Sequence, residues 1–278
     1  MNPFNIQQRQ SQLNLLAAKN GGNLNVVPAQ LRSTVRDYNV VNIDLDTVIY
    51  RIFSYNRFLS LLLNRQNTLV HPQAWQDPFE NFLLSSQGMY HGSPVSLQPI
   101  RDSWYGQCWT FKEECDGLWR SNTNNKVDRA VKVRTTARRL FESFYDFANP
   151  FHSLSFFIGR INYVNSNLLT TVLQNAYGYL TDTTNISQML TLLIKRQEFS
   201  YENELRLLYY TGANGNPAPI VYHYVIDPNV LFDEVVLDPW TNDTEMLAEE
   251  NDIRQAGFNN PIRRSDLYQP YMNVIQIP

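Results

Sequence analysis

The segment Phe199-Ser200-Tyr201-Glu202-Asn203-Glu204-Leu205-Arg206-Leu207-Leu208 carries the most structural information in this chain of 278 residues. Charged and apolar residues alternate along it, which predicts a β-strand over residues 203–210. Because alternate side chains of a strand share a face, Glu202, Glu204 and Arg206 would point the same way, and the intervening leucines would face a core. Two carboxylates and a guanidinium on one face can converge on one ligand. The alternative is a solvated strand face with alternating charges.

The rest of the chain supplies further strands and helices in mixed order. The sequence predicts strands over residues 47–53, 68–71, 107–111, 130–133, 155–164, 220–225, 231–237 and 261–268. It predicts helices after Ser54, from Pro78, and over residues 136–147, 165–179, 185–193 and 241–257. This order has no strict βαβ rhythm, so we expect an α+β fold with a mostly antiparallel sheet flanked by helices.

Residues 1–38 differ in composition from the rest of the chain. They are rich in Gln and Asn and contain the helix breakers Gly21-Gly22 and Pro28. We therefore interpret 1–38 as a polar N-terminal extension and 39–278 as the α+β domain.

Composition excludes several classes of protein. Hydrophobic residues make up 43% and aromatic residues 13%, as in a globular protein. The net charge is -3, so no general basic field is present to hold nucleic acid. No signal-peptide pattern is visible, and the apolar runs are far shorter than the ~20 residues that span a bilayer. Cys108 and Cys115 are expected to be free thiols, which indicates a soluble protein of a reducing, cytoplasmic compartment.

The order of several short motifs resembles a bacterial domain family of unknown function, over about residues 47 to 268. The motifs are a Tyr-Arg strand, a segment ending in Asp-Pro-Phe, a Cys-aromatic-Thr strand with a later Trp, and a Glu-x-Glu-x-Arg strand. In this chain they are Tyr50-Arg51, Asp77-Pro78-Phe79, Cys108-Trp109-Thr110 with Trp119, and Phe199 through Arg206. That family in turn resembles the ADP-ribosyltransferase fold, in which the sheet is split.

The resemblance implies NAD as a substrate and assigns roles to individual residues. Glu204 would hydrogen-bond the ribose 2′-hydroxyl and stabilise an oxocarbenium-like transition state, and Glu202 would act on the acceptor as a general base. Arg51 would hold a phosphate, and Thr110 would occupy the place of the middle-strand Ser or Thr. The middle motif here is Cys108-Trp109-Thr110, whereas the family has Ser-Thr-Ser. This difference bears on the expected NAD contacts more than on the expected role of Glu204.

Other side chains are candidates for the nucleotide pocket, each with a structural alternative. Tyr50, Trp109 and Trp119 would stack on nicotinamide or adenine, or else pack in the core. His71 would line the pocket, or else form structural hydrogen bonds. Arg206 would set the pKa values of the glutamates or form an inert ion pair, and Arg51 has the same structural alternative. Asp77 before Pro78 is interpreted as a helix cap.

The sequence thus predicts a mono-ADP-ribosyltransferase that transfers ADP-ribose from NAD to a protein acceptor, with arginine as first choice and nucleic acid less favoured. A toxin, effector or defence enzyme is expected, cytoplasmic or delivered into another cell's cytoplasm. No metal motif is present, and no membrane partner is expected. The alternative is a non-catalytic nucleotide- or protein-binding module on the same fold. A glycosidic hydrolase fits less well, because its two carboxylates should flank the bond.

Overall fold

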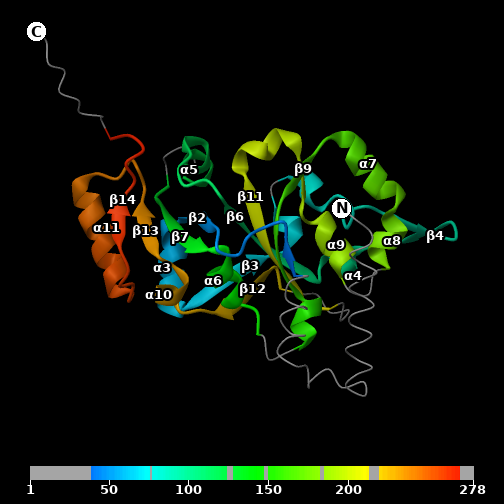
Figure 1. The fold of residues 1–278 in the computed structure, drawn as a ribbon, viewed down its shortest axis with the longest axis horizontal. Helices are drawn as coiled ribbons and strands as arrows, with labels where there is room; N and C mark the ends of the chain where they lie inside the picture. Colours follow the sequence, from blue (N-terminus) through cyan, green and yellow to red (C-terminus); the bar gives the residue numbers. More distant parts are fainter. Residues whose placement is uncertain are drawn as a thin grey trace, which may run out of the picture. The chain divides into compact units, whose positions relative to one another are not determined.

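The computed structural model describes residues 39–269, apart from residues 76, 124–127, 147–149, 182–184 and 213–218. The described chain divides into two compact units (Figure 1). Unit 1 comprises residues 39–47, 67–111 and 136–224, and unit 2 comprises 48–66, 112–135 and 225–269. The predicted extension over 1–38 lies outside the described residues, so its boundary stays a prediction.

Unit 1 is built around β11 (Glu204–Tyr210), the strand predicted from the Glu-x-Glu-x-Arg segment. It pairs antiparallel with β6 (Trp104–Thr110) on one side and with β8 (Phe156–Arg160) on the other. Beyond β8, β1 (Val40–Val41) adds a parallel strand. Beyond β6 come β3 (Gln66–Val70) and then β12 (Val221–Val225). The central position of β11 buries both of its faces.

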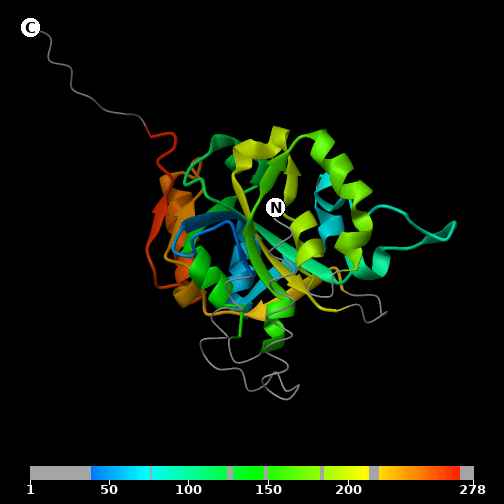
Figure 2. The same cartoon turned by 45° about the vertical axis from the view of Figure 1, so that its right-hand side comes forward.

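The remaining elements of unit 1 are short. The strands are β4 (Gly88–Tyr90), β5 (Ser93–Val95), β9 (Asn162–Val164) and β10 (Ile194–Arg196). The α-helices are α4 (Gln98–Arg101), α6 (Ala137–Glu142), α7 (Ser166–Gln174), α8 (Ala176–Leu180) and α9 (Ile186–Thr191). The 3-10 helices are η1 (Pro72–Ala74), η2 (Pro78–Asn81), η3 (Pro150–Leu154) and η4 (Gln197–Glu202). Figure 2 shows α7, α8 and α9 grouped together and the β4–β5 hairpin extending away from unit 1.

Unit 2 contains four neighbouring strands in the order β2 (Val48–Ser54), β7 (Ala130–Thr136), β13 (Glu234–Leu237) and β14 (Ile262–Arg264). Its helices are α3 (Tyr55–Asn64), α5 (Asp116–Asn122), α10 (Pro228–Leu231) and α11 (Asp243–Gln255). Three fully buried rings, Phe58, Phe232 and Phe258, join α3 to the C-terminal segments. This aromatic core fixes α3 within unit 2.

Burial along β11 separates two kinds of packing. Leu205 and Leu207 are fully buried on one face, as predicted. On the other face, Leu208 joins a core cluster with Trp104, Phe157 and the residues of α9. Glu204 and Arg206 share that face with Leu208 and are buried as well. The alternative of a solvated charged face is therefore wrong.

The expected α+β class with mostly antiparallel strands and flanking helices is confirmed. Some element boundaries differ from the prediction. The helix expected over 165–179 is two helices, because Asn175 interrupts it and its side-chain amide donates to the Thr171 carbonyl. The strand expected over 155–164, with a break near Gly159, is interrupted at Ile161 instead. The helix expected from Pro78 is the short 3-10 helix η2.

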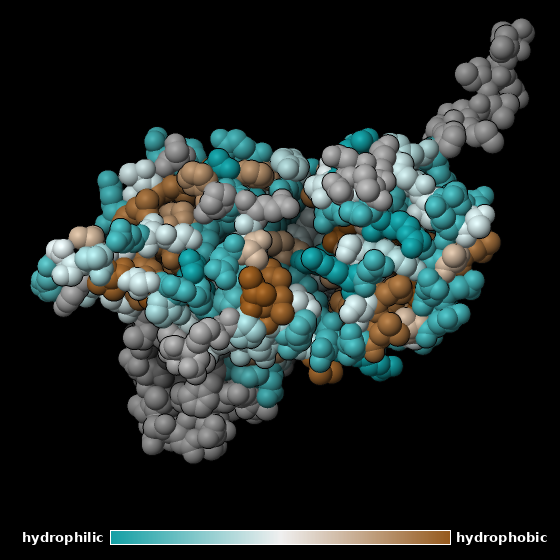
Figure 3. Space-filling model, turned by 180° about the vertical axis from the view of Figure 1, so that it is seen from behind, coloured by the Kyte–Doolittle hydropathy of each residue, from teal (hydrophilic) through white to brown (hydrophobic). Residues whose placement is uncertain are grey.

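Among the described residues, no helix combines the length and apolar character needed to cross a membrane. On the face shown in Figure 3, hydrophobic residues occur in small groups between hydrophilic ones. Exposed large hydrophobic residues such as Phe79, at 45%, and Tyr201, at 50%, are spread over several elements. Of these, Phe79 and Tyr201 are relevant to the site described below.

We expect Gly106→Ala to lower the free energy of unfolding by about 2 kcal/mol, because a small-to-large change here strains a packed core. A Cβ at Gly106 would lie 2.6 Å from Cζ2 of Trp75 and 3.0 Å from Cδ2 of Leu208. Gly178→Ala is the matched control, since nothing lies within 4 Å of the added carbon on α8. Chemical denaturation measures both. Equal stability of the two variants would contradict the packing described for β6.

Glu249→Gln tests a buried carboxylate of unit 2. Its side chain is 0% exposed, Arg129 pairs with Oε1 at 2.9 Å, and Oε2 has no hydrogen-bond partner among the described residues. Burial raises the pKa of Glu249 to about 7, against the opposing effect of Arg129. The folded protein therefore binds this proton more tightly than the unfolded chain, and wild-type stability should fall as the pH rises from about 4.5 to 7.

The Gln variant has no such titration, so we expect it to be more stable than wild type by about 1–2 kcal/mol at pH 8 and not at pH 5. Urea unfolding at the two pH values measures this difference. Glu250→Gln, at a partly exposed neighbour on α11, is the control. A variant of Glu249 that loses stability equally at both pH values would show that the Arg129 pair outweighs burial.

Candidate active site

The Glu-x-Glu segment bends at its middle residue. Strand β11 begins at Glu204, whereas Glu202 ends the 3-10 helix η4. Asn203 between them has φ 45 and ψ 62, a left-handed conformation that Asn tolerates better than most residues. The prediction that Glu202 shares a strand face with Glu204 is therefore wrong. The two carboxylates nevertheless converge, because both bind Lys195.

Glu204 is enclosed by its partners. Its Oε1 accepts from Nε of Arg206 at 2.7 Å, and its Oε2 accepts from Nζ of Lys195 at 3.0 Å and from a second Arg206 nitrogen at 3.3 Å. The Cys108 thiol on β6 also bonds to this carboxylate. The side chain is 4% exposed. In this structure, Glu204 therefore has little capacity left for a ribose hydroxyl.

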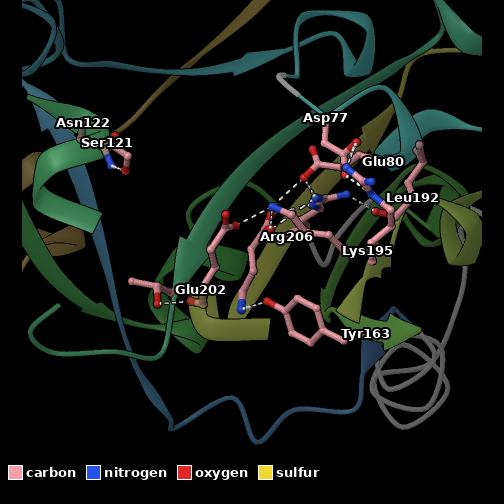
Figure 4. A network of polar contacts seen from close by, with 12 residues as sticks. Asp77, Glu80, Ser121, Asn122, Tyr163, Leu192, Lys195, Glu202 and Arg206 are labelled. Carbon is pink, nitrogen blue, oxygen red and sulfur yellow. Dashed lines mark hydrogen bonds and ion pairs between the residues drawn. The ribbon is translucent and has the colours of Figure 1, made fainter. Parts of the chain in front are cut away.

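Arg206 is fully buried and joins three elements. Besides Glu204, it contacts Oε1 of Glu80 on η2 at 3.1 Å and donates to the Leu192 carbonyl, just after α9, at 2.7 Å. Its guanidinium carbon lies 4.1 Å from the centre of the Trp75 ring. A planar group with five donors suits such a multidirectional role. Figure 4 shows Arg206, Glu80 and Lys195 directed toward one another.

A second ion pair lies beside this network. Asp77 caps η2 by accepting from the Phe79 amide at 3.0 Å, so the predicted cap is confirmed. The same carboxylate binds Arg196, the residue after Lys195, at 3.1 and 3.2 Å. The Arg196 guanidinium lies over the rings of Phe79 and Phe199 at 4.5 and 5.2 Å. Strand β10 thus attaches η2 to the rest of the network.

The protonation states follow from burial and from these partners. Burial alone would raise the pKa of Glu204, but Arg206 and Lys195 hold it down at about 2. Burial raises the pKa of Glu202, and Lys195 opposes this effect. Burial and the neighbouring Glu204 raise the pKa of the Cys108 thiol, which favours the thiol over the thiolate. Three glutamates against Lys195 and Arg206 leave one net negative charge in the network.

Two members of this network, Lys195 and Glu80, were missed by sequence reasoning. Lys195 lies in the three-residue strand β10, directly after an apolar run that was predicted as helix to 193. The sequence signal for Lys195 was its position between an apolar run and the Glu-rich segment, because a lysine that is buried with such a run needs an acidic partner. Glu80 lies three residues after the predicted cap Asp77, on the same side of a 3-10 turn. No spacing rule links these residues to Glu204.

The other predicted residues of unit 1 have the following positions. Thr110 on β6 is directly opposite Glu204, and its hydroxyl donates to the Glu202 carbonyl at 2.6 Å. Trp109 is buried and donates to Gln107 at 2.9 Å, within a polar network that includes Asn67. His71 is 1% exposed, and its ring lies 4.3 Å from that of Tyr105. Burial lowers the pKa of His71. Of these three, the structure brings only Thr110 to the glutamates.

Arg51, Tyr50 and Trp119 belong to unit 2. Tyr50 is buried, and Trp119 is fully buried and donates to Glu114 at 2.8 Å. Both rings face the Lys132 ammonium, at 5.6 and 5.7 Å. The Arg51 guanidinium carbon lies 4.9 Å from the Phe53 ring centre. Tyr50 and Trp119 thus have core contacts within unit 2. The NAD contacts expected for Arg51, Tyr50 and Trp119 stay predictions.

In the part of the chain that the structure describes, no group of three or more His, Cys, Asp or Glu residues is arranged to hold a metal ion.

Similarity to known proteins is limited to solved structures. No protein-family model and no curated protein matches the chain. DarT from Thermus sp. 2.9 in complex with NAD+ has 12% identity and a TM-score of 0.35, over 81% of this chain and 98% of that one. Its complex with carba-NAD+ has 11% identity and 0.35, over 80% and 96%. Its complex with ADP-ribosylated single-stranded DNA has 10% and 0.37, over 79% and 93%.

The acceptor expected from the sequence is corrected by the last of these structures. The prediction favoured a protein acceptor over nucleic acid, whereas the modified molecule in that DarT complex is single-stranded DNA. A protein acceptor is therefore withdrawn. The resemblance to a bacterial domain family of unknown function stays a prediction.

We expect Arg206→Met to lower the free energy of unfolding by about 3 kcal/mol at pH 7, because it leaves Glu204 and Glu80 with one buried cation instead of two. Glu204 has a depressed pKa in the folded state, so its contribution is present above about 4.5 and is lost as the pH falls toward about 2. The effect of the substitution should therefore shrink below pH 4.5. Urea unfolding across this pH range measures it.

Two further variants make that test specific. Adding Glu204→Gln to Arg206→Met should recover part of the loss, since it removes the unpaired charge. Arg120→Met removes a half-exposed ion pair with Asp116 and should change stability by less than about 0.5 kcal/mol. A loss from Arg206→Met no larger than that from Arg120→Met would refute the buried network.

Proposed function

We propose that this chain is an ADP-ribosyltransferase that uses NAD and that Glu202 is the carboxylate that meets the substrate. The observation that carries the proposal is the position of Glu202 at the accessible edge of a network with one net negative charge. Its side chain is 22% exposed, against 4% for Glu204 and 6% for Glu80. Its carboxylate contacts Lys195 through Oε2. A substrate at this edge therefore meets Glu202 first.

The charge of the network suits cleavage of the bond between nicotinamide and ribose. The nicotinamide ring of NAD carries a positive charge, which passes to the ribose in an oxocarbenium-like transition state as the bond breaks. Fixed negative charge in a water-poor environment stabilises such a state more than the ground state. Glu204, held ionised behind Glu202, contributes to this field without touching the sugar. The role is an electrostatic one and replaces the direct ribose contact expected from the sequence.

The proposed reaction is a substitution at C1′ of the ribose. The bond between ribose C1′ and the nicotinamide nitrogen breaks, and its electron pair leaves with neutral nicotinamide. A nucleophilic atom of the acceptor forms the new bond to C1′. The proton of that nucleophile passes to the Glu202 carboxylate and then to solvent. This use requires an ionised Glu202 before the step.

The acceptor class that we propose is single-stranded nucleic acid. Two residues with exposed rings adjoin members of the network in the sequence: Tyr201 directly precedes Glu202, and Phe79 directly precedes Glu80. Exposed aromatic rings offer stacking surfaces for unpaired bases, worth about 1–3 kcal/mol per base. ADP-ribosylated single-stranded DNA is also the ligand of one DarT structure. The net charge of -3 leaves stacking, not a basic field, as the main source of affinity.

A non-catalytic binding module is the second candidate. It is favoured by the saturation of Glu204 and Arg206, whose charged groups are fully engaged with each other, Lys195 and Glu80. Such a network stabilises the fold without chemistry.

Incubation of the purified chain with labelled NAD distinguishes the two candidates. We expect nicotinamide release and transfer of label to single-stranded oligonucleotides, and at least about a 100-fold lower kcat for Glu202→Gln. Glu198→Gln is the matched control, because Glu198 is an exposed carboxylate on the same 3-10 helix. Thermal unfolding of each variant verifies that it is folded.

Each outcome has a separate meaning. Nicotinamide release without transfer to DNA or RNA would retain the donor reaction and overturn the acceptor. Equal activity of Glu202→Gln and Glu198→Gln would remove Glu202 from the reaction. A folded wild-type chain that binds NAD without cleaving it would support the binding module.

A further inference from the structure

Lys195 has an unusual environment for a lysine. Its ammonium nitrogen lies 2.5 Å from Oε2 of Glu202, 2.6 Å from Oε1 of Glu80 and 3.0 Å from Oε2 of Glu204. An ammonium group has three N–H donors, so three carboxylates use its full capacity. The side chain is 7% exposed. Strand β10 fixes its backbone by parallel pairing with β9, where Lys195 is opposite Tyr163.

The three carboxylates depend on Lys195 to different extents. Arg206 pairs with Glu80 and Glu204, so these two retain a cation if Lys195 is removed. Glu202 has Lys195 as its cationic partner among the described residues. Glu202 is therefore connected to positive charge through a single ammonium group.

We infer that Lys195 is the positioning residue of this site: it gathers Glu80, Glu202 and Glu204 around one ammonium group and holds the Glu202 carboxylate ionised at the accessible edge. This inference rests on the proposed function, because it assigns the residue that prepares Glu202 for proton transfer. Lys195 acts through Glu202 and does not contact the acceptor itself. No sequence motif indicates a role for Lys195.

The charges around Glu202 support this role from every adjoining element. Lys195 and Arg196 come from β10, and Arg196 is already engaged by Asp77. Glu80 of η2 and Glu204 of β11 are negative and repel an ionised Glu202. The other ionisable groups around the network are Arg206 of β11, the Tyr163 hydroxyl of β9 and the Cys108 thiol of β6.

Protonation of Glu202 reflects this balance. Burial raises the pKa of Glu202, and so do Glu204 and Glu80, whereas Lys195 lowers it by a hydrogen bond and by its charge. Without Lys195, burial and the charges of Glu204 and Glu80 would raise the pKa of Glu202 with no opposing cation. The carboxyl group would then be protonated over more of the neutral range and would fail as a proton acceptor.

Lys195 itself is an unsuitable nucleophile or base. Burial would lower its pKa, but Glu204, Glu202 and Glu80 raise it above the ordinary value for lysine. The group is therefore an ammonium ion at neutral pH. A covalent role as an amine, such as Schiff-base formation, is excluded by this environment.

Substitution of Lys195 in the full chain tests the inference. For Lys195→Met we expect the acidic limb of the pH–rate profile for nicotinamide release to move up by at least about one pH unit, so that kcat falls about tenfold on that limb. KM should change less than about threefold, because the loss lies in proton transfer and not in substrate binding. Lys195→Arg keeps the charge and should return the limb to within about half a pH unit of its wild-type position.

Two more variants control for folding and for general loss of charge. Glu80→Gln with Lys195→Met removes one carboxylate together with the cation, so the network keeps one net negative charge and one less buried repulsion. Should Lys195→Met fail to fold, this double variant is expected to fold and to show the shifted profile. Arg138→Met removes a partly exposed cation paired with Asp46, outside this site, and should leave kcat and the pH profile unchanged.

A measurement independent of activity separates this inference from the proposed function. Carbon-13 NMR of labelled glutamate carboxyls, with the signal assigned by Glu202→Gln, should show the Glu202 midpoint at least about one pH unit higher in Lys195→Met than in wild type. Such a shift in a protein that does not cleave NAD would retain the role of Lys195 in ionising Glu202 and overturn the transferase. An active wild type with an unmoved midpoint and pH profile in both Lys195→Met variants would overturn the inference.

Discussion

One buried ammonium group, that of Lys195, organises the charged centre of unit 1. Three carboxylates from η2, η4 and β11 approach it within 3.0 Å. Bringing like charges so close inside a protein is strongly unfavourable unless cations and hydrogen bonds compensate. Lys195 and the fully buried Arg206 provide this compensation, and together they connect segments far apart in the sequence. The short elements β10, η2 and η4 meet at this ammonium group, and the Asp77–Arg196 pair adds a second connection between β10 and η2.

The same constraint gives the two glutamates of the Glu-x-Glu segment different environments. The left-handed backbone of Asn203 turns Glu202 off the strand, so that it ends η4 while Glu204 begins β11. Glu204 is consequently surrounded by donors, whereas Glu202 keeps an accessible edge. Two residues that look equivalent in the sequence thus acquire opposite environments and opposite pKa shifts.

Aromatic residues follow a comparable division. Trp109, Trp119 and Tyr50 look like candidates for nucleotide stacking, yet they are buried and their polar groups or faces are engaged within their own units. The rings that remain exposed near the network, Phe79 and Tyr201, had no such role in the sequence. Burial of an aromatic ring depends on what packs against it, which local pattern does not reveal.

The sequence by itself determined the α+β class, the strand of residues 204–210 with its buried leucines, the cap at Asp77 and the importance of the Glu-x-Glu-x-Arg segment. These features depend on alternation and on local backbone preferences, which residues within a few positions of each other decide. Only the tertiary structure decided that Lys195 and Glu80 belong to this segment, that Glu204 is enclosed and that Glu202 is accessible. The network pairs residues more than 100 positions apart, such as Glu80 and Lys195, and such pairing arises from packing and desolvation that no short stretch of sequence specifies.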